Sequence, residues 1–230
     1  MKIRHLNHSC LLIDVADQRI LVDPGGFSVD QVRQAPGLDA VSAVAITHQH
    51  PDHVNPELLG WVLGQNPGIA VIVEPETADL LAAEGVDLSG HTVVPLAAGT
   101  SHQLGPVTIS GVGGKHAIIH PDIACIGNTG LVITADGEPR LGVTGDSLEP
   151  VAEFQGIDAL AFAVVAPWSK MSETIDFLRA VRPKVALPVH DAVVSAAGRA
   201  IYLRQSTDLA PEGTEVRDWP GAERTVELTV

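Results

Sequence analysis

The chain has 230 residues, of which 45% are hydrophobic and 18% are charged, and its formal net charge is −14. This length and apolar content are typical of a soluble globular protein, and we expect one domain over residues 1–230. Because phosphate backbones are also negative, the charge argues against a nucleic-acid partner and favours a small-molecule substrate. The acidic surface is compatible with a homo-oligomer but does not specify one.

The first residues carry positive charge, as a signal peptide does, but polar residues from Asn7 to Asp14 interrupt the apolar stretch that export requires. The longest strongly apolar run, residues 160–166, is too short to cross a bilayer. We therefore predict a cytoplasmic protein without a membrane partner. The two cysteines, Cys10 and Cys125, stand in apolar, strand-like surroundings, and we expect both to be reduced core residues.

Short β-branched runs dominate the first part of the chain. Residues 10–15 and 19–22 predict a hairpin, which ends where Asp23-Pro24-Gly25-Gly26 breaks the chain. Residues 41–46 and 69–73 predict two buried strands.

Two helices are predicted around the second of these strands. The first has Asn55 as N-cap, Pro56 as its first residue and Glu57 as an acid in the first turn, and it runs to about residue 62. The second covers residues 76–84 and ends at Gly85.

The middle of the chain is rich in predicted strands. They cover residues 93–96, 103–104, 107–112, 124–126, 131–134 and 140–144.

The last third alternates between strands and helices. We predict strands over residues 159–165 and 185–189, and helices over residues 172–181 and 192–203. Ser172 is the expected N-cap of the first of these helices, and Arg182-Pro183 ends it. The order of elements predicts an α/β (α+β) protein in which two sheets lie face to face with helices outside, a four-layer αββα sandwich.

The segment that follows the strand at residues 41–46 carries three imidazoles and a carboxylate, from His48, His50, Asp52 and His53. Imidazole nitrogen and carboxylate oxygen suit Zn²⁺ and, less selectively, Mn²⁺ or Fe. No cysteine is present in the segment, which argues against a closed structural zinc site. A histidine-rich surface loop is the alternative, but the flanking strand and helix favour a metal site at a strand end.

Three further candidate ligands follow predicted strands, namely His116, Asp146 and His190. Each has an ordinary alternative, because His116 could be a loop histidine, Asp146 a turn residue after Gly145, and His190 a neighbour of a helix cap. Together with the earlier segment they favour function, because a site with two metal ions needs about this many more ligands, one of them a carboxylate that can bridge.

The chain resembles the metallo-β-lactamase superfamily over nearly its whole length. The resemblance rests on the His48-Gln49-His50-Pro51-Asp52-His53 motif, then His116, then Asp146 in Thr-Gly-Asp-Ser, and then His190 in Pro-Val-His-Asp. His8-Ser9 and Asp23-Pro24 are similar to elements of the branch that contains L-ascorbate-6-phosphate lactonase and N-acylphosphatidylethanolamine phospholipase D. Asn7 stands where that branch usually has glycine.

The resemblance implies the metallo-β-lactamase fold and two divalent metal ions per chain, with zinc favoured and manganese or iron allowed. It implies that His48, His50 and His116 bind the first ion, that Asp52, His53 and His190 bind the second, and that Asp146 bridges them. Two such ions can share a hydroxide that serves as the nucleophile. Asp52 is the expected catalytic residue, because it can also orient the attacking water and receive its proton.

Four residues are weaker candidates. His8 and Asp23 are candidates for hydrogen bonds to metal ligands, or for purely structural roles. His120 is a candidate substrate contact or a loop histidine, and Trp168 is a candidate wall of the substrate pocket or a core residue. The other histidines, at positions 5, 91 and 102, have no local partners that suggest chemistry.

The sequence therefore predicts a dinuclear metal-dependent hydrolase that acts on a small ester, lactone or phosphodiester. The alternative is a di-iron redox or metal-binding module of the same fold. Such modules usually act with a flavin domain, which nothing in this sequence supplies.

Overall fold

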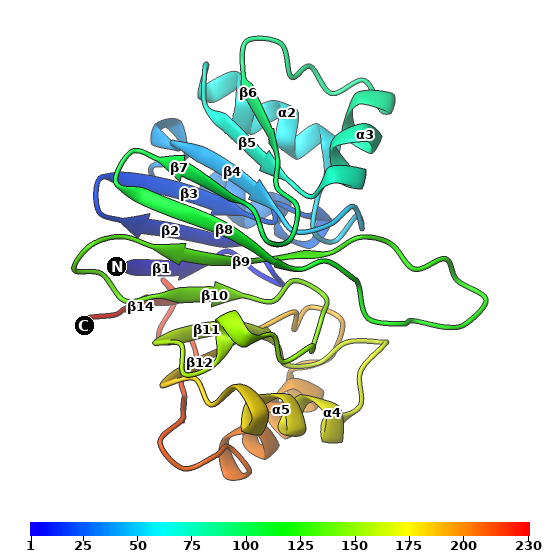
Figure 1. Ribbon diagram of the computed structural model, residues 1–230, viewed down its shortest axis with the longest axis vertical. Coiled ribbons are helices and arrows are strands. Elements are labelled where there is room, and N and C mark those ends of the chain that lie inside the picture. The colour runs from blue at the N-terminus through cyan, green and yellow to red at the C-terminus, as the bar shows by residue number, and fades with distance from the viewer.

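The computed structural model describes residues 1–230. Two seven-stranded sheets lie face to face, and helices cover the outer face of each (Figure 1). The four-layer αββα sandwich predicted from the sequence is confirmed. Both chain ends lie at the same end of the sheets (Figure 1).

The first sheet has the strand order β14-β1-β2-β3-β4-β5-β6. Its strands are β1 (Lys2–His5), β2 (Leu11–Val15), β3 (Gln18–Val22), β4 (Ala43–Ile46), β5 (Ala70–Val73), β6 (Thr92–Pro95) and β14 (Thr225–Glu227). Strands β14 to β3 pair antiparallel, and β3 to β6 pair parallel.

The second sheet has the order β13-β12-β11-β10-β9-β8-β7. Its strands are β7 (Ser101–Leu104), β8 (Val107–Gly113), β9 (Thr129–Thr134), β10 (Leu141–Val143), β11 (Ala159–Ala163), β12 (Val185–Val189) and β13 (Glu215–Val216). Strands β7 to β10 pair antiparallel, and β10 to β13 pair parallel, so the two sheets repeat one pattern.

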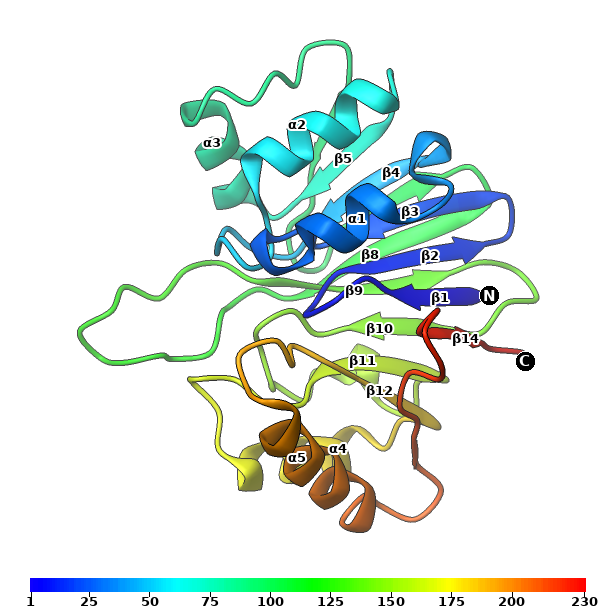
Figure 2. The same cartoon turned by 180° about the vertical axis from the view of Figure 1, so that it is seen from behind.

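The helices form the two outer layers (Figure 2). Those on the first sheet are α1 (Val29–Gln34), α2 (Pro56–Gln65) and α3 (Pro75–Ala83), and those on the second are α4 (Met171–Val181) and α5 (Ala196–Asp208). Three short 3-10 segments complete the set, η1 (Gly26–Ser28), η2 (Leu38–Ala40) and η3 (Ala152–Phe154). No helix is long and apolar enough to cross a membrane.

Successive side chains along a strand point to opposite faces of the sheet, so some pack between the two sheets and the others pack under the helices. In β3, Ile20 and Val22 face the opposite sheet, whereas Leu21 packs under the first group of helices with Leu58 of α2. Both faces of the central strands are thus buried, which explains why their sequences are continuous apolar runs. This packing holds the strand ends, and the loops that follow them, in fixed positions.

Four strand ends converge on one rim of the sandwich. The loops after β4, β8, β10 and β12 carry the predicted ligands, and their side chains lie close to one another around Asp146. The β8 to β9 loop extends far beyond the sheets (Figure 1).

Several predicted helix ends are confirmed. The Asn55 side chain accepts a hydrogen bond from the Leu58 backbone N–H at 2.8 Å, and Pro56 begins α2, which runs to Gln65 rather than to about residue 62. Gly85 follows α3 with a φ of 75°, and Arg182 ends α4 with a φ of 53°.

Other boundaries were predicted wrongly. Lys170, not Ser172, is the N-cap of α4, because the Glu173 carboxylate accepts a hydrogen bond from the Lys170 backbone N–H at 2.9 Å. The last helix begins at Ala196 rather than at residue 192, because the Ser195 hydroxyl caps it by accepting from Gly198 N–H at 3.2 Å.

The strand predicted at residues 124–126 is wrong, since this segment belongs to the extended β8 to β9 loop and pairs with no strand. For the same reason Cys125 is exposed and is not a core residue, whereas Cys10 is buried as expected. The apolar residues at 123–126 lie on an exposed loop, where periodicity carries no information about pairing.

Candidate metal centre

The loop after β4 is fixed by a buried carboxylate from the end of β3. The two oxygens of Asp23 accept hydrogen bonds from the Thr47 backbone N–H and from the Thr47 hydroxyl, each at 2.8 Å. Asp23 is fully buried and also accepts from His53 Nδ1 at 2.9 Å. Because one carboxylate holds both ends of the loop, the histidines between them have defined directions.

Hydrogen bonds at Nδ1 set the tautomers of three further histidines. His190 Nδ1 donates to the Val165 carbonyl at 2.8 Å, and His116 Nδ1 donates to the Ala117 carbonyl at 2.6 Å. The Thr47 hydroxyl gives its proton to Asp23, so it can only accept from His48 Nδ1, at 3.1 Å. In each ring, as in His53, Nδ1 carries the proton and Nε2 faces the centre of the site.

The inward-facing atoms form two groups. One atom from each of His48, His50, His116 and Asp146 lies within 4.8 Å of the others, and the same holds for His8, Asp52, His53 and His190. The fold therefore brings all seven predicted metal ligands together. The first group contains His48, His50 and His116 as the resemblance implies, and the second contains Asp52, His53 and His190 with His8 in addition.

Asp146 lies between the two groups. Its Oδ2 is 3.2 Å from His116 Nε2 and 3.8 Å from His48 Nε2. Its Oδ1 is 3.0 Å from His53 Nε2 and 3.3 Å from His190 Nε2. Each carboxylate oxygen thus faces one group, which is the arrangement of a bridging ligand.

The charges of the site favour a cation at its centre. Burial alone would lower the pKa of His190, but Asp146 and Asp52 raise it to about 9. Burial likewise opposes charge on His53, but Asp146 and Asp23 raise the pKa of His53 well above its usual value. A proton held between these rings and carboxylates occupies the place a metal ion would take, so metal binding releases protons.

Two observations indicate that these residues can bind a metal, namely their chemical types and the buried polar atoms that lack hydrogen-bond partners. His48 Nε2, His190 Nε2 and Asp146 Oδ1 are buried and have no hydrogen-bond partner. Buried polar atoms without partners are rare because desolvating them is costly. A divalent cation would satisfy all three, and imidazole with carboxylate suits zinc, manganese or iron.

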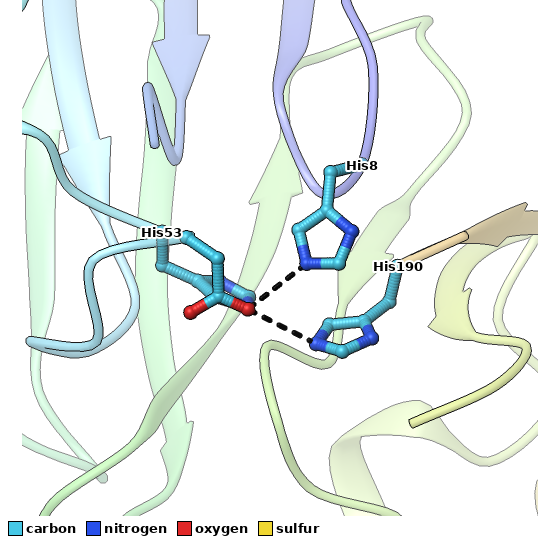
Figure 3. Close-up of side chains that lie close together, drawn as sticks. His8, His53 and His190 are labelled. Carbon is cyan, nitrogen blue, oxygen red and sulfur yellow. Dashed lines mark hydrogen bonds and ion pairs between the residues drawn. The ribbon is translucent and has the colours of Figure 1, made fainter. Parts of the chain in front are cut away.

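His8 differs from the other histidines of its group. Its Nδ1 accepts a hydrogen bond from the Ala192 backbone N–H at 3.2 Å, so its proton is on Nε2 and points at Asp52 Oδ2, 3.0 Å away. Figure 3 shows the rings of His8 and His190 directed at one carboxylate oxygen. In this tautomer His8 has no lone pair for a metal and orients Asp52 instead.

The backbone around His8 explains a feature of the sequence. Asn7 has a φ of 89°, in the left-handed region that favours glycine and tolerates asparagine. Its side chain donates to the Phe27 carbonyl at 2.6 Å. Asparagine therefore forms a turn whose backbone conformation favours glycine.

Removing the charge of Asp23 tests whether it orients the metal site. We expect Asp23→Asn to lower zinc affinity about 10- to 100-fold, because an amide is a weaker acceptor for His53 and Thr47. Competition with a chromogenic chelator measures this. Asp136→Asn, an exposed turn residue, is the control. Equal affinities of wild type and Asp23→Asn would contradict the expected role.

Trp168 closes one side of the site. Its indole Nε1 donates to Asp146 Oδ2 at 2.9 Å. With Ile119 and Val193 it walls a pocket of ≈ 260 Å³ that opens onto Asp52, His50 and His190. His120 lies outside this pocket on the β8 to β9 loop, where its ring is 60% exposed and its Nδ1 accepts from the Asp122 backbone N–H.

A partly buried network of ion pairs and hydrogen bonds lies behind the site, and the sequence analysis did not predict it. His5 is 2% exposed, and its Nε2 donates to the His8 carbonyl at 2.6 Å. Arg224 donates to His5 Nδ1 and lies 3.5 Å from Asp191, which Arg199 binds at 2.6 Å. The network fixes the loops that carry His8 and His190. The one sequence feature that pointed to the network is the position of Asp191 directly after His190.

Comparison with known proteins gives an independent result. Residues 2–190 match the model of the β-lactamase superfamily domain. Protein Rv0786c of Mycobacterium tuberculosis is 37% identical over 94% of this chain and 96% of its own. A UPF0173 metal-dependent hydrolase of Xanthobacter autotrophicus is 31% identical over 64% of this chain and 62% of its own. The metallo-β-lactamase fold protein YhfI of Bacillus subtilis has a TM-score of 0.74 at 15% identity, with 98% of each chain covered.

Proposed function

Because the chain belongs to the metallo-β-lactamase superfamily and is a metal-dependent hydrolase of that fold, we propose that it uses two divalent metal ions to hydrolyse a small ester-like substrate. The observation that carries the proposal is Asp146, whose two carboxylate oxygens face separate groups of imidazoles. A single ion would leave one of these oxygens and its histidines without a partner.

In this proposal His48, His50 and His116 hold the first ion, and Asp52, His53 and His190 hold the second. Asp146 would serve as a ligand of both ions, one oxygen for each. Two observations support this division. The Nε2 atoms face the centre of the site, and the ligand atoms within each group lie within 4.8 Å of one another. When bound, the ions lower the pKa of a shared water and polarise the oxygen of the scissile group.

The chain's own residues then position the reaction. Asp52 is 25% exposed at the pocket, so it can accept a hydrogen bond from the attacking water, while His8 Nε2–H holds its other side. Burial disfavours the Asp52 carboxylate, but the His190 ring, whose Nε2 lies 3.6 Å away, and the hydrogen bond from His8 hold its pKa below the usual range. Asp52 is therefore better suited to orienting the water and passing its proton on than to keeping that proton.

The walls and charge of the site favour a small substrate without strong negative charge. Ile119, Trp168 and Val193 make the mouth largely apolar, and the chain has a formal charge of −14. We propose an ester or lactone ahead of a phosphodiester. His8-Ser9 and Asp23-Pro24 support a place near the branch with L-ascorbate-6-phosphate lactonase and N-acylphosphatidylethanolamine phospholipase D.

A hydrolysis panel on the zinc- or manganese-loaded protein tests the function. It compares an aryl ester, several lactones, bis(4-nitrophenyl) phosphate and a β-lactam. We expect one of the first three classes to be hydrolysed, with His48→Ala lowering kcat/KM by about 10³-fold because a metal contributes several kcal/mol to the barrier.

His102→Ala, on β7 of the second sheet, is the control and is expected to keep wild-type activity. Activity that survives in His48→Ala would contradict the proposal. Iron in the purified protein together with oxygen or peroxide turnover, and no hydrolysis, would favour the di-iron redox alternative.

A further inference from the structure

A second hollow begins at the metal centre and leads away from it. It is a groove of ≈ 670 Å³ that shares His116 and Trp168 with the site. Its walls come from four segments, namely the start of the β8 to β9 loop, the loop after β10, the loop between β11 and α4 that carries Trp168, and helix α4. Ligand sites for small molecules commonly have volumes of about 300–1,000 Å³, so the groove can hold a substantial part of a substrate.

Helix α4 contributes one complete face to the groove. Glu173, Asp176, Phe177 and Ala180 are spaced as i, i+3, i+4 and i+7, which places them on one side of a helix. Phe177 is buried at the base of this face, whereas Ala180 is exposed and leaves open space. Because the side chain at position 180 is only a methyl group, the protein leaves this part of the groove free for a ligand.

The opposite walls carry three large apolar side chains. Ile118, Leu148 and Trp168 line them, and Ile118 is 70% exposed. An exposed large apolar residue beside an active site is consistent with a wall that a bound apolar group covers. The half-buried Ser147 is an uncharged polar residue among those that line the groove, and the charged ones are all exposed at its rim.

The rim carries an unequal charge. The residues that line the groove include three acids, Glu149, Glu173 and Asp176, and one base, Lys115. All four side chains are exposed. Glu173 is partly neutralised by Lys170 at 3.8 Å, but Glu149 and Asp176 have no ion-pair partner. A carboxylate or phosphate entering this groove would meet net negative charge.

We propose that this groove binds an apolar, uncharged substituent of the substrate, several carbons long, and selects against a negatively charged one. The inference deepens the proposed hydrolase function, on which it rests, because the reacting group would lie at the metal centre beyond Trp168. The occupant is part of a small molecule, since a volume of ≈ 670 Å³ is that of a small-molecule site.

Binding of unreactive analogues tests the groove separately from catalysis. The probes are butanamide, hexanamide and octanamide, and suberamic acid, which has eight carbons and a terminal carboxylate. Their Kd values are measured by calorimetry, and the indole N–H signal of Trp168, assigned with Trp168→Phe, shows by NMR whether the probe binds beside this residue. We expect Kd to fall about two- to fourfold per methylene in the amide series, and suberamic acid to bind at least about tenfold more weakly than octanamide.

Two variants locate the effect. Ala180→Phe is expected to raise the Kd of octanamide about tenfold, whereas Ala82→Phe, the same change at an exposed position of α3, leaves it unchanged. Asp176→Asn is expected to improve suberamic acid binding severalfold at low salt and less at high salt, because surface charges are screened. Asp79→Asn on α3 is the matched control.

Each outcome decides one of the two proposals. Kd values that do not depend on chain length, equal binding of suberamic acid and octanamide, or no effect of Ala180→Phe would overturn the groove assignment. Should the amides bind as expected while the metal-loaded protein hydrolyses none of the matching alkanoate esters, the groove would stand and the ester hydrolase assignment would fail. Hydrolysis of all esters at one rate, with no length-dependent binding, would support the hydrolase assignment and overturn the groove.

Discussion

Replacing Asp146 with alanine is expected to abolish binding of both metal ions and to lower hydrolysis by at least about 10³-fold. The reason is that its two oxygens lie within 3.3 Å of ring nitrogens in both groups, and no neighbouring carboxylate can take this place. Without it, Asp52 still lies 3.6 Å from His190 Nε2 and 4.0 Å from His53 Nε2, but no carboxylate faces the group of His48, His50 and His116.

The metal-dependent gain in stability measures this loss. Zinc at a hundred times its Kd should stabilise the wild-type protein by about 2.7 kcal/mol, seen as a rise in Tm, and should leave Asp146→Ala unchanged. Asp122→Ala is the control, because Asp122 is 91% exposed on the loop that also carries His116. A Tm rise in Asp146→Ala equal to that of the wild type would contradict a bridging role.

Gly25→Ala is expected to have the second-largest effect. Gly25 has φ −87° and ψ 176°, which any residue can adopt, so its requirement is spatial. A Cβ atom there would overlap the Asp52 carbonyl and lie 2.6 Å from the His53 backbone nitrogen. Since backbone cannot rotate away, we expect a loss of about 3 kcal/mol in the free energy of unfolding, together with a displaced metal loop and weaker zinc binding.

The matched control is Gly60→Ala in α2, where an added Cβ meets nothing within 4 Å. That change is expected to raise stability by about 0.5–1 kcal/mol, because alanine is the better helix former. Denaturant unfolding of both variants gives the two values. If Gly25→Ala kept wild-type stability and zinc affinity, the close contact between the β3 end and the metal loop would not constrain the site.

Local patterns account for what the sequence could predict. The ligand segment from His48 to His53 is contiguous in the sequence. Asn55-Pro56 begins the next helix through capping interactions within the helix itself, which can be predicted without knowledge of tertiary contacts. The apolar runs of the central strands reflect burial on both faces, so their existence was predictable although their ends shifted by one or two residues. The αββα sandwich followed from the order of these elements.

Contacts between distant residues account for what was missed. Strand β14 pairs with β1 across the whole chain, and Arg224 reaches His5 over 219 residues, yet neither segment has a distinctive pattern. His8 was a candidate, but only the Ala192 N–H at its Nδ1 shows which nitrogen bears the proton. The groove along α4 depends on the path of the β8 to β9 loop, in which a strand was wrongly predicted at residues 124–126.

Metal analysis of the protein purified without chelators tests the central claim most directly. Inductively coupled plasma mass spectrometry on the folded chain should find two divalent transition-metal ions per chain, or two after dialysis against zinc or manganese. Fewer than one ion per chain, with none taken up on dialysis, would contradict a dinuclear centre built on Asp146.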